Sequence, residues 1–239
     1  CKLLFSTSEL DIRDTILTAL NNVAVCVPAV RGEILDTDLI NLFEQAGFDD
    51  KNCVLKYCAL LNIISNEESC CMKLLENGVQ RLLITLQDKF SAGTHGKDVT
   101  AAILHNMSLK RGTMSSGVLS TLLLIVKNCK EARVLWAVRA IANFSAHSKS
   151  RLQLTKERNL IPILNGIMRY GCEQADRVQH YCAIAICNIL STTVDKDIIE
   201  HLLTNGGVVD LVVVTLLRVN SGSTKEFLGK ALFNLLCRA

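Results

Sequence analysis

The sequence predicts an all-α protein built as a solenoid of three-helix repeats. One phrase recurs six times along the chain: a small or aliphatic residue, an aliphatic residue, any residue, and an asparagine. These asparagines are Asn22, Asn62, Asn106, Asn143, Asn188 and Asn234. The gaps between them are 40, 44, 37, 45 and 46 residues, a period typical of stacked helical repeats. The repeats share one order of helix, stop, apolar helix, turn and third helix, with losses in some copies.

This period predicts a single domain over residues 1–239, with an incomplete first repeat. The repeat boundaries fall at about 1–25, 26–66, 67–109, 110–147, 148–192 and 193–239. No repeat can bury its apolar face alone, so each must stack on its neighbours. The first repeat starts abruptly and lacks room for its first helix, and the second runs from about Pro28 to Ser65.

The third repeat shows the plan clearly. It predicts helices at Glu68–Glu76, Val79–Phe90 and Asp98–Leu109, with a flexible loop over residues 91–96. Between the first two helices stands Asn77-Gly78, and both residue types tolerate the left-handed conformation that ends a helix. We therefore expect the first helix to stop there.

The fourth and fifth repeats differ in length. Residues 111–117 leave little room for a first helix in the fourth repeat, and Leu119–Val126 is apolar nearly all round, so it must be buried on most sides. In the fifth repeat, Pro162 stands near the start of the middle helix, where a missing N–H costs little. The expected helices of the fifth repeat are Ser150–Arg158, Leu160–Tyr170 and Ala175–Leu190.

The sixth repeat predicts helices at Asp195–Asn205, Val208–Val219 and Thr224–Cys237, the last capped by Ser223 or Thr224. The run Val212–Val214 would suggest a strand by local propensity alone. Its place in the repeat overrides that propensity, because the equivalent segments of other repeats are rich in Leu and Ile.

Several of these features resemble the armadillo repeat over essentially the whole chain: the three-helix plan, the glycine before the middle helix, Ile161-Pro162, and the Ala-Leu-x-Asn-Leu phrase at Ala231–Leu235. The resemblance implies a right-handed superhelical armadillo-type solenoid. It also implies that the third helices line a concave groove, where ladder asparagines bind the backbone of an extended peptide. It indicates no particular chemistry, since armadillo proteins share a scaffold rather than a reaction.

Residues four and seven positions before each asparagine share its helix face. This face gives Arg139 and Trp136 with Asn143, Ile184 and Tyr181 with Asn188, and Lys230 and Phe227 with Asn234. A carboxamide can pair with any peptide unit, and the aromatic and basic residues could select acidic ligand groups. The predicted partner-binding residues are Asn106, Trp136, Arg139, Asn143, Tyr181, Asn188, Lys230 and Asn234.

A second interpretation of the same residues stays open. The asparagines could bond within the solenoid, and the aromatic rings could fill space between successive third helices. Importin-α-like proteins pair a tryptophan with the asparagine four residues later, and no repeat here has that pair. The corresponding positions hold Thr18, Cys58, Ala102, Arg139, Ile184 and Lys230, so a receptor for basic import signals is not expected.

Composition limits the partners further. The net charge of +3 gives no reason to expect nucleic-acid binding. No apolar run approaches the roughly 20 residues that span a bilayer, so a membrane role would need a targeting or lipid signal missing from this chain. Because the sequence has no initiating Met, we expect a fragment or processed chain.

The 11 cysteines are scattered and include no Cys-x-x-Cys pair. We expect reduced core thiols and a cytoplasmic, reducing location. The cysteines expected on apolar helix faces are Cys26, Cys58, Cys129, Cys182, Cys187 and Cys237.

The sequence carries no catalytic fingerprint. His180, Cys182 and Cys187 do not have zinc-ligand spacing, and residues 93–98 only faintly resemble a phosphate loop. We expect no enzyme activity, no metal and no cofactor.

The favoured function is a protein–protein interaction scaffold or adaptor that holds a partner segment along the groove. Two alternatives remain: a regulatory armadillo domain of a larger protein, and a structural component of a cytoskeletal or flagellar assembly. Weak self-association through Cys1–Phe5 or Leu232–Leu236 is a further expectation, because neither end carries a polar cap.

Overall fold

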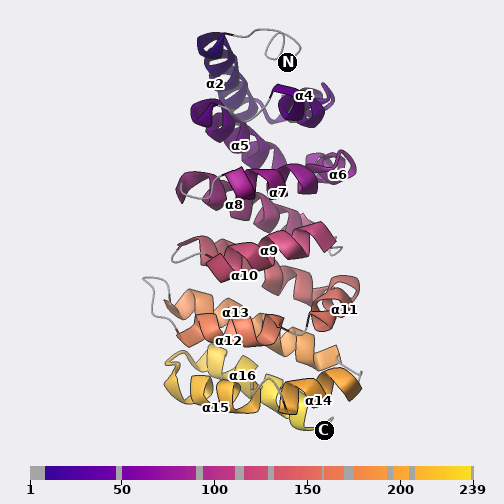
Figure 1. The fold of residues 1–239 in the computed structure, drawn as a ribbon, viewed down its shortest axis with the longest axis vertical. Helices are drawn as coiled ribbons and strands as arrows, with labels where there is room; N and C mark the ends of the chain where they lie inside the picture. The colour runs from indigo at the N-terminus through magenta and orange to yellow at the C-terminus, as the bar shows by residue number, and fades with distance from the viewer. Residues whose placement is uncertain are drawn as a thin grey trace. The chain divides into compact units, whose positions relative to one another are not determined.

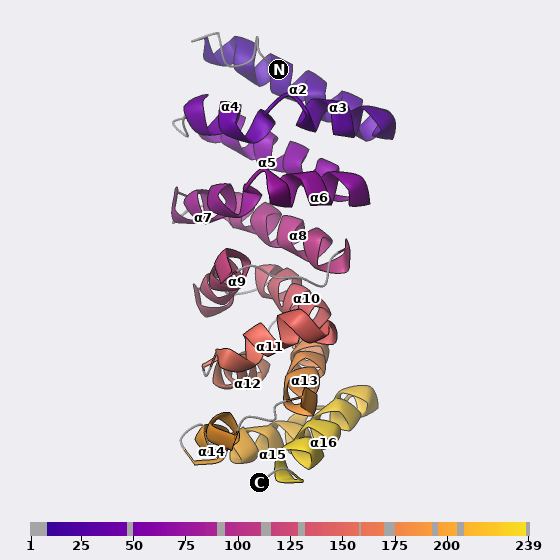
Figure 2. The ribbon, with the colours of Figure 1, turned by 90° about the vertical axis from the view of Figure 1, so that its right-hand side faces the viewer.

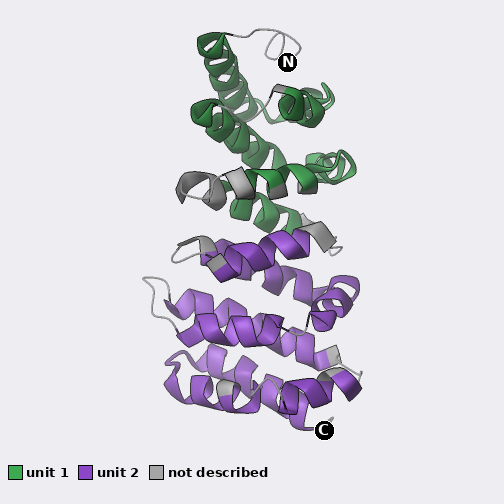
Figure 3. Ribbon diagram, in the orientation of Figure 1, with its two compact units in different colours: residues 1–110 green, residues 111–239 purple. Residues whose placement is uncertain are grey.

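The structure is a computed structural model that describes residues 9–46, 50–89, 94–110, 116–128, 132–157, 159–169, 175–192, 196–204 and 208–237. Within these ranges every regular element is a helix and none is a strand. The chain divides into two compact units, residues 1–110 and residues 111–239 (Figure 3).

Unit 1 is built around three long helices, α2, α5 and α8, of which α5 packs against both others. Shorter helices connect them and cover one side (Figure 1). The elements are α2 (Leu10–Cys26), the 3₁₀ turn η1 (Pro28–Val30), α3 (Arg31–Leu35), α4 (Leu39–Ala46), α5 (Lys51–Ser65), α6 (Glu68–Glu76), α7 (Val79–Lys89) and α8 (Thr94–Lys110).

The core of unit 1 is anchored by Tyr57 of α5, which is fully buried. Its ring stacks on that of Phe43, with centroids 3.6 Å apart. Its hydroxyl donates a hydrogen bond of 3.2 Å to the carbonyl of Leu39, so the buried polar atom is satisfied. Burial raises the pKa of Tyr57 well above its usual value, and the phenol stays neutral.

Asp50 caps the start of α5. Its carboxylate accepts hydrogen bonds from the backbone N–H groups of Asn52 at 3.2 Å and Cys53 at 3.1 Å. A bond from the Cys53 side chain, followed by these backbone bonds, lowers the pKa of Asp50. Because the folded chain favours the charged form, this stabilisation is present at neutral pH and is lost as the pH falls through the lowered pKa.

The predicted ends of the helices in unit 1 are partly confirmed. Helix α6 stops where expected, and Gly78 follows it with a left-handed φ of 79°. The loop predicted up to residue 96 is wrong from Thr94 onward, because α8 already begins there. Gly96 therefore lies in the first turn, where backbone N–H groups have no intrahelical acceptor in any case. Residues 90–93 lie outside the described ranges.

Unit 2 has two layers (Figure 2). Helices α10, α13 and α16 pack in succession in one layer, and α9, α12 and α15 form the other. The elements are α9 (Ser116–Asn128), α10 (Ala132–Ala146), α11 (Ser148–Lys156), α12 (Leu160–Arg169), α13 (Ala175–Thr192), α14 (Lys196–Thr204), α15 (Val208–Arg218) and α16 (Gly222–Leu236).

Two local expectations in unit 2 have opposite outcomes. The valine run Val212–Val214 is helical within α15, as the repeat predicted and local propensity did not. The expected cap of the last helix is wrong: Ser221 is the N-cap, with its hydroxyl accepting from the N–H of Thr224 at 3.4 Å. The helix begins at Gly222, so Ser223 and Thr224 already lie inside it. Residues 111–115, where a first helix had little room, lie outside the described ranges.

The described cysteines are free thiols, and most are buried. Cys58, Cys182 and Cys187 are in the core as expected, and burial raises the pKa of Cys58 to about 12. The expectation was wrong for Cys26 and Cys237, which are exposed because they stand at the ends of α2 and α16. Cys129 lies outside the described residues.

Among the described helices, none combines the length and the apolar character needed to cross a membrane.

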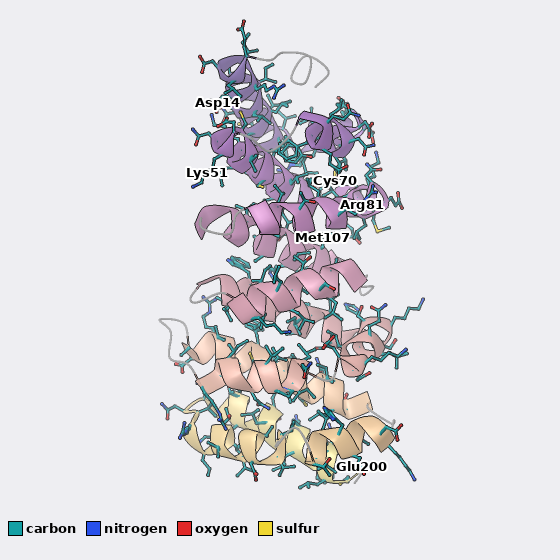
Figure 4. All side chains as sticks on the ribbon, in the orientation of Figure 1. Asp14, Lys51, Cys70, Arg81, Met107 and Glu200 are labelled. Carbon is teal, nitrogen blue, oxygen red and sulfur yellow. The ribbon has the colours of Figure 1, made fainter. Side chains whose placement is uncertain are left out.

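We expect opposite effects from alanine at two glycines. At Gly78 the left-handed backbone disfavours a Cβ, so Gly78→Ala should lower the free energy of unfolding by about 1 kcal/mol. The added Cβ would lie 3.2 Å from the flexible guanidinium of Arg81, labelled in Figure 4, which can move. Gly229→Ala, inside α16 with nothing within 4 Å, should raise the free energy by about 0.5–1 kcal/mol. Thermal denaturation measures both, and shifts of the same sign would contradict this assignment.

A second stability prediction concerns Asn165 on α12. The side chain is fully buried, and neither amide atom has a hydrogen-bond partner among the described residues. Replacing it by leucine removes an unsatisfied polar group at similar volume, so Asn165→Leu should raise the free energy of unfolding by about 1–2 kcal/mol. Ile163→Leu on the same helix is the control, with little expected change. A lower Tm for Asn165→Leu would show that the amide has a partner.

Candidate partner-binding site

Packing leaves one narrow strip of α10 accessible. Between Val134 and Ser145, every residue is buried except Trp136, Arg139 and Asn143, which are half-buried. Their spacing of three and four residues places them on one face of the helix. The predicted groove residues of the fourth repeat are therefore the ones that this helix presents.

The neighbouring long helices continue the strip. On α13 the half-buried positions include Tyr181, Ile184 and Asn188, and Phe227 and Asn234 occupy the matching positions on α16 beside the exposed Lys230. The helices lie side by side in one layer, opposite α9, α12 and α15 (Figure 2). The resulting surface, called the unit 2 face, consists of Trp136, Arg139, Asn143, Tyr181, Ile184, Asn188, Phe227, Lys230 and Asn234.

An arginine joins two aromatic rings at one end of this face. The guanidinium carbon of Arg139 lies 5.0 Å from the ring centroid of Trp136 on its own helix. It lies 5.3 Å from the ring centroid of Tyr181 on α13. Both distances are within the range of attractive cation–π contacts. Arg139 and the ring of Tyr181 thus connect the successive helices α10 and α13. Both aromatic side chains are half-buried, so part of each remains accessible.

His180 connects α13 to α16, and the sequence had offered it only as an unsuitable metal ligand. Its ring meets those of Tyr181 and Phe227 edge-on, each with centroids 5.7 Å apart. Its Nδ1 atom lies 3.4 Å from the hydroxyl of Thr224. The signal that could have found it is its position eight residues before Asn188, close to the same helix face.

Lys230 is less available than its sequence position suggested. Its ammonium group forms a 2.6 Å ion pair with Glu226, one turn earlier on α16. This contact lowers the pKa of Glu226 and raises the pKa of Lys230, so both stay charged and neutralise each other. The Lys230 ammonium also lies 5.9 Å from the ring centroid of Phe227.

The asparagines of unit 2 have different surroundings. The amide of Asn188 donates a 3.1 Å hydrogen bond to the hydroxyl of Ser145, which in turn donates to the carbonyl of Ala142. One N–H and the carbonyl oxygen of Asn188 remain for a ligand. The side chain of Asn234 has no hydrogen-bond partner among the described residues. Asn143 is half-buried between Arg139 and the end of α10.

In unit 1 the predicted site residue Asn106 is engaged within the solenoid. Its amide nitrogen donates to the Oδ1 of Asn62 at 3.1 Å and to the hydroxyl of Ser65 at 3.0 Å. Both amide hydrogens are thereby used, and only the carbonyl oxygen remains. The free amide donor of this pair is on Asn62, whose nitrogen has no partner in the described part of the chain. Asn62 is one of the six recurring asparagines, but it is not among the predicted partner-binding residues.

Unit 1 also has an open pocket of about 560 Å³ between α2 and α5, which the sequence did not suggest. It is lined by Asp11, Asp14, Asp50 and Lys56, among others. Asp14, labelled in Figure 4, forms a 2.6 Å ion pair with Lys56, and Asp50 caps α5. Two of the three carboxylates thus already have structural roles.

Across the described ranges, no group of three or more His, Cys, Asp or Glu side chains is placed to hold a metal ion.

Of the recurring asparagines, Asn188 on α13 should contribute to stability, whereas Asn234 on α16 should not. Asn188→Ala removes the bond to Ser145 and should lower the free energy of unfolding by about 1 kcal/mol. Asn234→Ala, at the same repeat position but without a described partner, should change it by less than about 0.5 kcal/mol. Chemical denaturation of both variants measures the difference. Equal losses would contradict a structural role specific to Asn188.

Comparison with known proteins concerns the fold. No protein-family model matches the sequence, and no curated protein matches it. Among solved structures, a designed armadillo repeat protein is 18% identical, with 98% of this chain and 97% of that chain covered and a TM-score of 0.74. A second, in complex with the peptide (KR)4, is 17% identical, with 98% and 97% covered and a TM-score of 0.73.

A third structure comes from work on computationally designed armadillo repeat proteins for modular peptide recognition. It is 17% identical to this chain, with 97% of this chain and 97% of that chain covered and a TM-score of 0.72. Three likenesses over nearly the whole length agree with the helices described above. The chain therefore has an all-α, armadillo-type repeat fold.

Proposed function

We propose that the chain is a protein-interaction scaffold that binds an extended segment of a partner protein along the unit 2 face. One observation carries this proposal. On α10 every residue between Val134 and Ser145 is buried except Trp136, Arg139 and Asn143, and the matching positions of α13 and α16 add further aromatic rings and amides: Tyr181, Asn188, Phe227 and Asn234.

The chemistry of the strip suits a peptide. Asn188 retains a donor and an acceptor beyond its bond to Ser145, and Asn234 retains its whole carboxamide. Such groups pair with backbone N–H and C=O groups whatever the peptide sequence. The rings of Trp136, Tyr181 and Phe227 add apolar area, which dominates the energetics of many interfaces.

The structural neighbours support binding in general terms. One of them is a complex with a peptide, and another was designed for peptide recognition. The proposed activity of this chain is accordingly binding, with no catalytic step. The free, mostly buried thiols support action in a reducing, cytoplasmic compartment.

The test begins with selection of short random peptides that bind the whole chain. Trp136 is the single tryptophan, so its fluorescence reports directly on the face during titration. Ile184→Arg places a long charged side chain in the middle of the strip, at a half-buried position that can reach solvent. We expect it to weaken binding at least about tenfold, because it blocks the backbone path.

The matched control replaces two exposed residues of the same unit, Gln153→Ala on α11 and Glu200→Ala on α14. It should bind as the wild type does. Equal binding by wild type and Ile184→Arg would overturn the proposed site, and so would a matching loss in the control. Circular dichroism and Tm establish that each variant is folded.

A further inference from the structure

The guanidinium of Arg139 is the most unusual group on the unit 2 face. It lies over the rings of both Trp136 and Tyr181. These three residues are called the Arg139 shelf. Two helices position it, since Trp136 and Arg139 belong to α10 and Tyr181 to α13. A side chain fixed by two rings loses less freedom when it binds a ligand than a freely moving one.

This cation has no anionic partner within the described part of the chain. No carboxylate there lies within ion-pairing distance of Arg139, and no acceptor takes a hydrogen bond from it. By contrast, two other cations described above are paired: Lys230 with Glu226, and Lys56 with Asp14. A half-buried guanidinium with unused N–H donors is costly to desolvate unless a partner supplies the acceptors.

The surrounding charge favours an anion. On α10, α13 and α16 the described carboxylates are Asp176 and Glu226, and Glu226 is neutralised by Lys230. Arg177 lies one turn before Tyr181 on the same side of α13 and is exposed. The described cationic side chains of these helices are Arg139, Arg177, Lys225 and Lys230. Among the described charged side chains of these three helices the cations outnumber the carboxylates four to two, which favours the approach of acidic segments.

We propose that the Arg139 shelf binds an aspartate or glutamate side chain of the partner segment, so that the scaffold selects acidic peptides. This inference rests on the proposed function and names the partner class. Two parallel N–H···O bonds join a planar guanidinium to a carboxylate, a geometry that a lysine cannot supply. The rings beside it exclude water and accept an apolar neighbour of the acidic residue.

A single carboxylate matches the shelf in charge. One guanidinium carries one positive charge, and the ion pair with Glu226 leaves Lys230 no surplus charge for a dianion. The proposal is thus an acidic side chain in an otherwise uncharged segment. A basic segment would be disfavoured, because Arg139 and Arg177 would repel it.

The experiment uses three short-peptide libraries that differ only at one central residue: glutamate, its uncharged isostere glutamine, or lysine. All other positions are randomised over uncharged residues. Binding to the whole chain is followed by Trp136 fluorescence. We expect the glutamate library to bind about tenfold or more tightly than the glutamine library, and the lysine library to bind most weakly.

Variants of Arg139 then assign the preference. Arg139→Met keeps the apolar stem against the rings and should remove the advantage of glutamate over glutamine. Arg139→Lys keeps the positive charge but lacks the planar guanidinium, so it should retain only a minor part of the advantage of glutamate over glutamine. Arg139→Glu should reverse the order, with lysine peptides favoured. Reversal is a gain of binding, which a misfolded variant could not produce.

The outcomes separate this proposal from the one on which it rests. Equal binding of the glutamate and glutamine libraries, still abolished by Ile184→Arg, would overturn the acidic preference and leave the peptide-binding face intact. A glutamate preference that survives Arg139→Met would also overturn the shelf. If Ile184→Arg leaves the binding of every library unchanged, or if no library binds, both proposals fail.

Discussion

Close packing between successive long helices is the constraint on which the rest of unit 2 depends. In α10 and α13 several buried residues are small: Ala137, Ala140, Ala183 and Ala185 are all fully buried. Small side chains let the helix backbones approach closely, and burial of the larger aliphatic residues around them supplies the driving force. On α10 the accessible positions between Val134 and Ser145 are then Trp136, Arg139 and Asn143, so recognition by this stretch of the helix would use these residues. The position of the candidate site follows from how the core is packed.

The same packing explains why the ladder asparagines have two roles. A carboxamide at the margin of the core is half-buried, so the protein can meet part of its hydrogen-bonding capacity while the rest stays accessible. Asn106 is fully used as a donor by Asn62 and Ser65, whereas Asn188 gives up one hydrogen to Ser145. The two interpretations left open by the sequence, structural bond and ligand contact, are therefore not exclusive. In Asn188 the structural bond uses one amide hydrogen, and the other N–H and the carbonyl oxygen remain for the proposed ligand contact.

Much of the fold was predictable because its signals are local and repeated. The period of the asparagine phrase, the Asn77-Gly78 stop and the apolar middle helices all depend on residues close together in the chain. The start of α8 at Thr94 and the cap at Ser221 were missed, because several residues there suit a cap or a first turn equally well. The exposure of Cys26 and Cys237 was not predicted. Both residues stand at the end of a helix, where a position on the apolar face does not ensure that neighbouring helices cover the side chain.

For the candidate site, helix spacing correctly placed Trp136, Arg139 and Tyr181 on accessible strips, but it could not give their pairings. That Arg139 meets Tyr181 depends on the offset between α10 and α13. The ion pair of Glu226 with Lys230, by contrast, is an (i, i+4) pair on one helix, which helix spacing could have indicated. Contacts between helices are set by three-dimensional packing, which a periodic pattern alone does not specify. The contacts of His180 with Phe227 and Thr224 are likewise contacts between helices, although its position relative to Asn188 could have placed it near the site.

The bond between Ser145 and Asn188 has a consequence for how such a chain can change over time. The two residues are 43 positions apart, in different repeats, yet they share a hydrogen bond. Loss of the serine would remove the acceptor of one Asn188 N–H, and loss of the asparagine would leave the buried hydroxyl of Ser145 with only its bond to the carbonyl of Ala142. Repeats that carry this bond are not interchangeable modules, so duplication, deletion or shuffling of a single repeat must preserve the match at both of its boundaries.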